Sequence, residues 1–367
     1  MITNNPENER IKRRYFAYLK EAKRYSEASL DGVTKALHRF ESYTRFRAFR
    51  AFHIEQAIGF KRSLADQDTR RGGGKLSKAT LHQTLSALRA FFLWLAAQPG
   101  YRSRLSYSDA DYFNLSEKET RVAKAKREQR TPAVEQIQHV LTTMPAATPL
   151  EQRNRALIAF ALLTGARDGA LASFKLKHVD LAEGLVTQDA REVKTKFSKT
   201  FTTWFFPVGG DAFAIVQEWV ERLRREHLWG PDDPLFPSTR MGRSAENGFR
   251  AEGLERKHWS TATPIRAIFR DAFEGARLPY FHPHSFRRTL ALLGERMCRT
   301  PEEFKAWSQN LGHDGVLTTF TSYGDLPPHR QAEVIRRLAA GRTAGPAAAD
   351  LIDEFRDFVR LRMGDAA

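Results

Sequence analysis

The stretch His284-Ser285-Phe286-Arg287-Arg288-Thr289-Leu290 is the part of the sequence that most strongly indicates the fold and the site. Leu311-Gly312-His313 follows it, and Tyr323 lies shortly beyond, so about 40 residues hold histidines, arginines and a tyrosine. Arginine forks bind phosphate oxygens, histidine transfers protons near neutral pH, and tyrosine can act as a nucleophile. These residue types together predict a site that binds a phosphodiester and reacts with it.

Size and charge set the first limits on the protein. A chain of 367 residues is long for one compact core, so we expect two domains. Lysine and arginine total 59 against 43 acidic residues, which gives a formal charge of +16 and a field that attracts polyanions. A nucleic acid is therefore the leading partner, and a merely well-solvated basic surface is the alternative.

Cys298 is the only cysteine, so one chain cannot build a disulfide framework or a cysteine-based zinc site. No apolar run approaches the roughly 20 residues that cross a bilayer, and the start from Met1 to Arg10 is polar. We therefore expect a soluble, cytoplasmic, nucleoid-associated protein without a membrane partner.

The first domain is predicted to be a helical bundle covering residues 1–105. Ser77 is placed to cap a helix whose apolar stripe is wide enough for the centre of that bundle: Leu81, Leu85, Leu88, Phe91, Phe92 and Leu95. Upstream, basic residues alternate with aromatic ones, so the rings can be buried while the guanidinium groups of Arg45, Arg47 and Arg50 face DNA phosphates. The alternative is an amphipathic helix with a solvated basic face.

Residues 106–130 lack apolar periodicity and end in a basic run, so we interpret them as an interdomain linker. Lys124, Lys126 and Arg127 are its candidates for contacts with the DNA backbone. The second domain is then expected to span residues 131–340, with Thr131 as the N-cap of its first helix and Pro132 at the first helical position.

The first half of the second domain contains a buried helix and a small sheet. Residues 154–163 are nearly all apolar, Gly165 ends this helix, and Arg167 comes near the start of the next, where an anion is favoured. Residues 184–187, 191–197 and 201–208 are predicted as three strands, the last two forming a hairpin. Lys194 and Lys196 are two apart and share a face near its turn, although a hairpin lysine is usually only solvated. Residues 238–258 are weakly patterned and give no prediction.

The second half carries the opening motif and a tail. We expect a helix to begin at Ser285, with His284 just before it and Arg287 in its first turn. A short helix over 307–311 should end at Gly312 and leave His313 on a turn. The segment 341–367 is expected as a C-terminal tail helix that is joined to the domain through a hinge at residues 341–346. Its residues 350–363 carry an apolar stripe that needs a groove, in its own chain or in a neighbour: Leu351, Ile352, Phe355, Phe358 and Val359.

Phosphodiester chemistry assigns a role to each candidate side chain. Arg167 and Arg287 can stabilise the growing negative charge in place of a metal, and Tyr323 can form a covalent phosphotyrosine that conserves bond energy without ATP. His284 can accept the phenolic proton, a lysine can protonate the leaving oxygen, and His313 can bind a non-bridging oxygen. Taken singly, each residue also has an ordinary explanation as a cap, an ion pair or part of a core.

These motifs, taken together, resemble the tyrosine recombinase (phage integrase) family over most of the chain. The stretch Leu162-Leu163-Thr164-Gly165-Ala166-Arg167 resembles the family's first arginine box, and residues 284–289 resemble the second. Residues 311–313 and Tyr323 resemble the two motifs that follow. Residues 77–95 resemble a helix of the family's N-terminal core-binding domain. The resemblance implies a mainly α protein with a small antiparallel β-sheet, a SAM-like helical domain and a tyrosine-recombinase catalytic domain.

The same resemblance implies the reaction and its residues. Arg167, His284, Arg287 and His313 would activate the phosphate, Tyr323 would attack it to give a 3′-phosphotyrosine, and Lys194 or Lys196 would be the general acid, with no cofactor. The protein would be a site-specific recombinase or integrase of a mobile element, acting as a homotetramer on DNA. The sequence departs from the family's pattern at two places. Ala170 replaces the usual acidic residue, so Asp168 is a candidate to orient Arg167. His313 and Tyr323 are ten positions apart, where nine is usual.

Two other functions are compatible with these residues. A type IB topoisomerase-like enzyme would use the same set to relax DNA without exchanging partners. A catalytically inactive accessory protein would only bind DNA, although the presence of Arg167, Arg287 and Tyr323 disfavours it.

Overall fold

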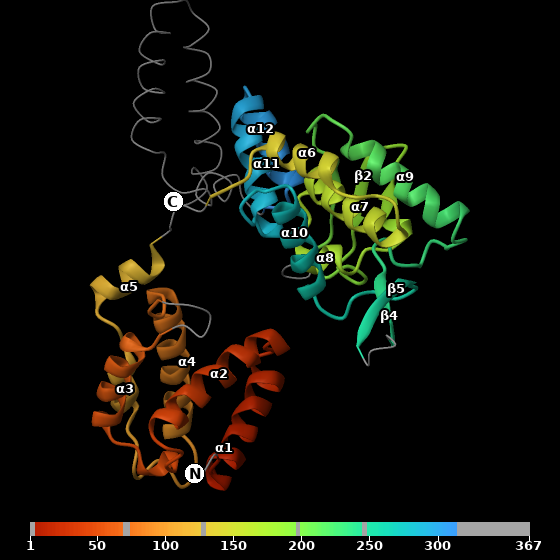
Figure 1. Ribbon diagram of the computed structural model, residues 1–367. Helices are drawn as coiled ribbons and strands as arrows, with labels where there is room; N and C mark the ends of the chain where they lie inside the picture. The colour runs from red at the N-terminus through yellow and green to blue at the C-terminus, as the bar shows by residue number, and fades with distance from the viewer. Residues whose placement is uncertain (1–3, 69–73, 126–129, 196–198, 244–247, 314–367) are drawn as a thin grey trace, which may run out of the picture. The chain divides into compact units, whose positions relative to one another are not determined.

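The computed structural model of the chain describes residues 4–68, 74–125, 130–195, 199–243 and 248–313 (Figure 1). The chain divides into two compact units, Met1–Arg127 and Glu128–Ala367, and each is described by itself. Both units are mainly helical, with small antiparallel sheets in the second, as the sequence predicts.

The first unit is a bundle of helices whose starts follow from capping side chains. Asn5, Ser26 and Ser77 each accept a backbone N–H bond at the start of α1, α2 and α4, so that a donor of the first turn is satisfied. The helices are α1 (Pro6–Ala17, continued by a π-helical turn over Tyr18–Ala22), α2 (Glu27–Tyr43), α3 (Ile54–Asp66), α4 (Lys78–Ala96) and α5 (Glu117–Lys124).

Helix α4 supplies the centre of the first unit's core. The predicted stripe is confirmed, because all six of its side chains are at most 2% exposed. Phe92 packs edge to face against Phe40 of α2, with ring centroids 5.5 Å apart, and against Phe52 at 4.4 Å. Aromatic pairs in these geometries add to the stabilisation from apolar burial alone.

The segment expected as a linker is folded onto this core up to Lys124. A 3-10 helix over Tyr107–Phe113 buries Phe113, which is 1% exposed and lies 5.0 Å from the Phe92 ring. Helix α5 follows it and contacts α4. The apolar residues of a 3-10 segment do not follow the 3.6-residue period, and that explains why the sequence pattern looked structureless.

The second unit is built around α7 (Pro149–Thr164), which is buried from Ala156 to Thr164, so the prediction of a buried helix is confirmed. Thr148 and Glu151 form a capping box at its start, and Gly165 ends it in a left-handed conformation. Its other helices are α6 (Val134–Thr143), α8 (Asp168–Leu171), α9 (Ala212–Arg225), α10 (Thr263–Gly275), α11 (Pro283–Met297) and α12 (Pro301–Asn310).

Three predicted helix starts are wrong, one of them that of α12, which begins at Pro301 and not at residue 307, because Thr300 caps it there by accepting the Glu303 N–H. Helix α6 begins at Val134 and not after Thr131, because the Pro132 carbonyl accepts a 2.7 Å bond from the Thr289 hydroxyl instead of entering a helix. Helix α11 begins at Pro283, two residues before Ser285, and the Ser285 hydroxyl bonds back to the His282 carbonyl at 2.6 Å. His284 therefore lies inside the first turn.

A three-stranded antiparallel sheet has the order β1 (Val179–Asp180), β2 (Leu185–Gln188) and β3 (Phe201–Trp204). Strands β2 and β3 pair with Val186 opposite Thr203, so the partner of β3 is the strand expected over 184–187 and not the one expected over 191–197. The expected strand over 191–197 is wrong in its described part, 191–195, which forms turns. Asp189 folds this segment locally, since its carboxylate binds Arg191 and its carbonyl accepts from the Val193 N–H at 2.7 Å.

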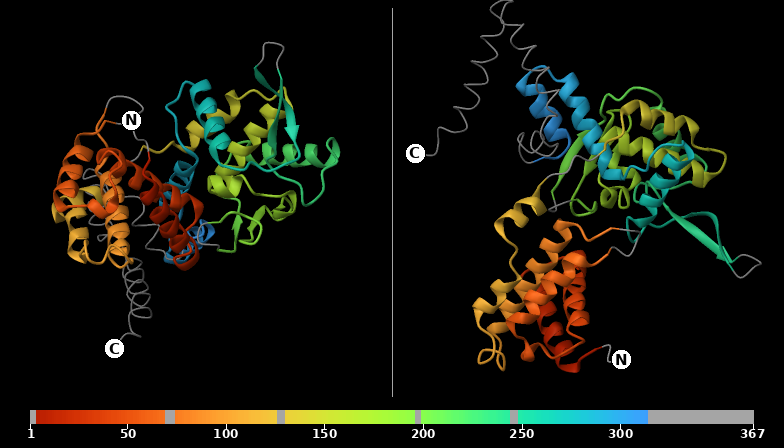
Figure 2. Two further views of the ribbon diagram at one scale, coloured as in Figure 1. Left: turned by 90° about the horizontal axis from the view of Figure 1, so that it is seen from below. Right: turned by 60° about the vertical axis from the view of Figure 1, so that its left-hand side comes forward.

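A second hairpin, β4 (Ser238–Arg243) and β5 (Phe249–Glu255), occupies the stretch that gave no prediction. Its strands extend away from the helices of the second unit (Figure 2). Because few of its side chains are buried, alternation of apolar and polar residues is weak. A register shift between Arg240 and Met241 interrupts the alternation further.

Candidate active site

Arg287 joins the sequence motifs into one site. Its side chain is 3% exposed, and its Nη1 donates a 2.7 Å hydrogen bond to the Gly165 carbonyl at the end of α7. Nη2 donates to the Leu311 carbonyl after α12 and lies 3.2 Å from His313 Nε2. One guanidinium thus binds the segments that carry the first and third motifs, as a rigid fork of donors is suited to do.

Two glycines make these close approaches possible. Gly165 has φ of 58°, and a Cβ there would lie 2.9 Å from Leu290 Cδ1. Gly312 has φ of 68°, and its Cβ would lie 2.6 Å from the Phe201 ring of β3. Other residues would be strained in this backbone conformation and would push the neighbouring element away. The glycine of Leu311-Gly312-His313 therefore lets His313 follow α12 directly, on the turn that the sequence predicts.

His284 lies in the first turn of α11, three residues before Arg287, so both side chains share a face of the helix. Burial of part of its ring and the positive charges of Arg287, His282 and Arg167 lower the pKa of His284 to about 4. The ring of His282 lies 6.2 Å away and nearly parallel. The ring is therefore neutral at pH 7 and able to accept a proton, although so low a pKa makes it a weaker base than an ordinary imidazole.

Arg167 is the residue directly before α8, at its N-cap position, and its side chain is half-buried. Asp168 binds Arg266 of α10 through a 2.6 Å contact, and Ala170, at the position expected to be acidic, is 1% exposed. The Asp168 carboxylate therefore binds Arg266. The suggested role of Asp168 in orienting Arg167 stays a prediction. Arg266 was missed in the sequence because its partner lies 98 positions away.

Lys194 lies in the long loop between β2 and β3. Its backbone N–H donates a 2.9 Å bond to the Ser173 hydroxyl, and a Cβ on Gly169 of α8 would lie 3.9 Å from the Lys194 Cβ. The backbone at Lys194 is therefore close to the helix that begins after Arg167. Lys196 and Tyr323 lie outside the described residues, and their predicted roles stay predictions.

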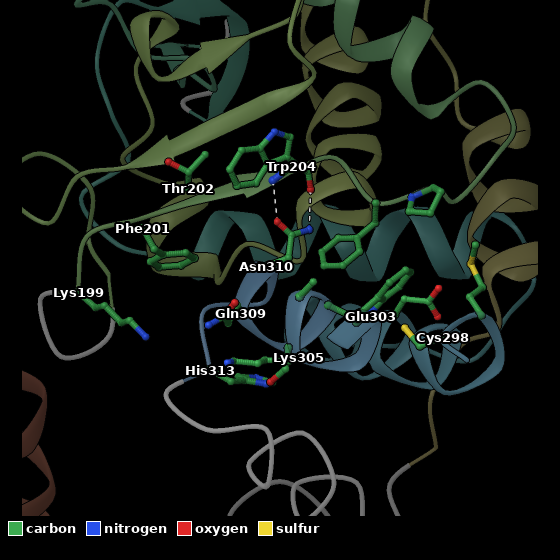
Figure 3. Close-up of a pocket in the computed structure, with 16 residues that line it drawn as sticks. Lys199, Phe201, Thr202, Trp204, Cys298, Glu303, Lys305, Gln309, Asn310 and His313 are labelled. Carbon is green, nitrogen blue, oxygen red and sulfur yellow. Dashed lines mark hydrogen bonds between the residues drawn. The ribbon is translucent and has the colours of Figure 1, made fainter. Parts of the chain in front are cut away.

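A cavity of about 860 Å³ lies beside His313, between β3 and α12 (Figure 3). Phe201, Trp204 and Trp307 supply much of its apolar lining. Asn310 bonds to both backbone groups of Trp204, at 2.7 and 2.9 Å, and so satisfies part of the edge of β3. The position of Asn310 directly before the third motif is the only signal for this contact in the sequence.

The basic residues of the first unit lie on different structural elements from those expected. Arg45, Arg47 and Arg50 are exposed, but Arg45 and Arg47 lie on the turn after α2, and Arg50 lies in a 3-10 helix over Phe49–Ala51, 3.3 Å from Glu7, so none lies on an amphipathic α-helix. Buried Asn8 holds this turn by donating to the Arg47 carbonyl at 3.0 Å. Lys124 is exposed at the end of α5, and Lys126 and Arg127 lie outside the described residues.

Comparisons with known proteins identify the family and the fold. The model of the Phage integrase family matches residues 131–328. Among curated relatives, the tyrosine recombinase XerC of Xanthomonas axonopodis pv. citri (strain 306) is 26% identical, covering 74% of this chain and 72% of the relative. The tyrosine recombinase XerC of Bacillus pumilus (strain SAFR-032) is 23% identical, covering 85% of this chain and 90% of the relative.

Solved structures share the fold at low identity. A lambda integrase (75–356) dimer bound to a COC′ core site matches with a TM-score of 0.59 and 14% identity, covering 87% of this chain and 96% of that one. A lambda integrase tetramer bound to a Holliday junction matches at 0.56 and 16%, covering 84% and 77%. XerH bound to its difH substrate before cleavage matches at 0.54 and 16%, covering 84% and 80%. Within the described residues, no helix is long and apolar enough to cross a membrane.

Proposed function

Because the chain belongs to the phage integrase family, we propose that it cuts and rejoins double-stranded DNA at specific sites through a covalent 3′-phosphotyrosine formed by Tyr323. The observation that carries this proposal is the contact of Arg287 with Gly165, Leu311 and His313, which gathers three of the motifs around one buried cation. Such a preorganised cationic site stabilises the charge that develops on phosphate in the transition state.

Each group then has one step in the reaction. Arg167, Arg287 and His313 bind the non-bridging oxygens, and neutral His284 takes the proton of the Tyr323 hydroxyl as its oxygen bonds to phosphorus. Lys194 or Lys196 gives a proton to the departing 5′ oxygen as the bond between phosphorus and that oxygen breaks. The exposed arginines of the first unit and Lys124, Lys126 and Arg127 bind DNA phosphates.

Assembly on DNA is part of the proposal. The dimer and the tetramer described for the lambda integrase structures support a homotetramer that holds two duplexes. Residues 1–105 and 131–340 would act as the two DNA-binding domains, and the basic end of the segment 106–130, from Lys124 to Arg130, would follow the DNA backbone between them.

The experiment uses the full chain and a suicide duplex carrying its recombination site, in buffer containing EDTA. We expect the wild-type protein to form a denaturant-resistant adduct, because fixed cations replace a metal ion in this chemistry. Tyr323→Phe should form none while binding the duplex with similar affinity, since only the nucleophilic oxygen is removed.

Several outcomes would contradict the proposal. An adduct formed by Tyr323→Phe would remove the nucleophile assignment, and activity restored only by magnesium would indicate a nuclease. Relaxation of supercoiled DNA without exchange between two duplexes would instead support the topoisomerase-like alternative.

A further inference from the structure

Glu192, two residues before Lys194, accepts hydrogen bonds from three side chains outside its own loop, two lysines and a histidine. Lys175 and Lys177 donate to its Oε1 at 3.0 and 2.8 Å, and His178 Nε2 lies 3.0 Å from its Oε2. These three residues belong to the segment just after α8, whereas Glu192 belongs to the loop between β2 and β3. The contacts therefore attach the beginning of this loop to the framework of the second unit.

The tautomer of His178 determines which group donates in its contact with Glu192. His178 Nδ1 accepts the backbone N–H of Lys175 at 3.0 Å, so the proton of the neutral ring is on Nε2 and is donated to Glu192. His178 is 5% exposed, which restricts its ring to one position. Hydrogen bonds from Lys177, His178 and Lys175 hold the pKa of Glu192 well below its usual range, so the carboxylate is charged at neutral pH.

The backbone between Glu192 and Lys194 is held as well. Val193 is 2% exposed within the core of the second unit, and the Lys194 N–H donates to the Ser173 hydroxyl at 2.9 Å. Three successive residues of the loop thus have fixed contacts, the last of them beside the helix that begins after Arg167. The side chain of Lys194 itself is exposed.

We propose that Glu192 is a positioning residue that holds Lys194 where it can protonate the departing 5′ oxygen. This inference rests on the proposed function, and it takes Lys194 as the general acid, because the backbone at Lys194 is held next to the helix that begins after Arg167. A general acid must remain within hydrogen-bond reach of the leaving oxygen, and a displacement of about 1 Å can cost roughly 100-fold in rate.

Asp232 provides a matched control. It binds the same two lysines, at 3.2 Å from Lys175 and 2.9 Å from Lys177, but it lies on the segment before β4 and not on the lysine loop. Asp232→Asn removes one negative charge from the same cluster and leaves the loop attached. Any effect of Glu192 that depends only on local charge should therefore appear in both variants.

The experiment compares Glu192→Ala, Glu192→Gln and Asp232→Asn on two suicide duplexes, one normal and one with a 5′-bridging phosphorothiolate at the cleaved bond. A thiolate leaves without a proton, so the second duplex does not need the general acid. We expect Glu192→Ala to cleave the normal duplex roughly 10- to 100-fold more slowly and the phosphorothiolate at close to the wild-type rate. On the normal duplex, the cleavage rate of Glu192→Gln should lie between those of Glu192→Ala and the wild type. Asp232→Asn should cleave both duplexes at the wild-type rate.

The controls distinguish the possible failures. Equal slowing of Glu192→Ala on both duplexes, or normal cleavage of both, would overturn the positioning role. If Glu192→Ala does not fold, Glu192→Gln and Ser173→Ala, which removes the acceptor of the Lys194 N–H, must show the same selective rescue or the proposal is wrong. Absence of any adduct with the wild-type protein on either duplex would contradict the proposed function itself.

Discussion

Arg287 performs a structural task that is separate from its proposed contact with DNA. Its two terminal nitrogens donate to the carbonyls of Gly165 and Leu311, which end different helices. The side chain is buried, so neither carbonyl could recover a bond from bulk water if the guanidinium were lost. Loss of Arg287 should therefore reduce both stability and catalysis.

Arg287→Lys tests this double role. A single ammonium cannot reproduce the fork, so at least one buried carbonyl is left unpaired, at a cost of about 1–3 kcal/mol. We expect that loss in the free energy of unfolding of the second unit, measured with urea, together with loss of adduct formation. Arg296→Lys, on the exposed last turn of the same helix, is the control and should leave both unchanged. Wild-type stability in Arg287→Lys would show that the two carbonyl bonds contribute little.

His284 couples the stability of the protein to pH. Its pKa is about 4 in the folded chain, below the ordinary value near 6.5 that it regains on unfolding. Between these two values the unfolded state binds one proton more than the folded state, so stability rises with pH through this window and falls on acidification. Burial lowers the pKa of His282 and His258 too, so they act in the same direction.

His284→Gln should therefore lose less stability than the wild type when the pH falls from 7 to 5. Urea midpoints measured across this range provide the comparison, and the double variant with His282→Gln should show a still smaller loss. Identical pH dependence in the wild type and His284→Gln would mean that the imidazole is not held neutral by its surroundings.

At the scale of elements, the contact between β3 and the turn after α12 determines where His313 lies. Gly312 has no side chain and lies against the Phe201 ring, while Asn310 binds the backbone of Trp204. The strand and the end of the helix therefore hold each other through a glycine and an asparagine, with little room for a larger residue.

Gly312→Ala should weaken this contact. The left-handed backbone costs about 1–2 kcal/mol for a residue with a Cβ, and overlap with Phe201 adds a further ~1–3 kcal/mol. We expect chemical unfolding to show that loss, and adduct formation to fall because His313 moves. Gly275→Ala, at the end of α10, is the control, since a Cβ there meets nothing within 4 Å. Adding Phe201→Ala should recover the part of the loss that comes from overlap; no recovery would contradict the steric explanation.

At the scale of the whole molecule, we propose that the tail docks on a neighbouring protomer. The apolar stripe of residues 350–363 lies outside the described residues, and its large side chains would each contribute roughly 1.5–3 kcal/mol when fully buried. A tail passed from each protomer to the next is a head-to-tail contact, and four such contacts can close a ring around two duplexes.

Truncation at Gly341 tests this proposal. The shortened protein should bind a single site with near-normal affinity and form little synaptic complex or recombinant product, as measured by gel shift and by a two-duplex recombination assay. Recombination at the normal rate would remove the docking role, and failure to fold would indicate that the tail packs on its own unit.

Local sequence was enough to predict the mainly helical fold, the buried helices α4 and α7, and the family to which the chain belongs. The helices depend on patterns within about 20 residues, such as a cap or an apolar period, whereas the family was recognised from several short motifs taken together. The helix ends at Gly165 and Gly312 were also predictable, because glycine favours the left-handed backbone found there.

Contacts between distant segments were decided only by the tertiary structure. The bond from Arg287 to Gly165 spans 122 positions, and the attachment of Glu192 to Lys175, Lys177 and His178 joins a loop to another segment. The core role of Phe113 and the hairpin β4–β5 were likewise hidden, because 3-10 turns and solvated strands lack a clear apolar period. A pattern of residues shows which face of an element is buried, but the partner that buries it depends on the packing of the whole unit.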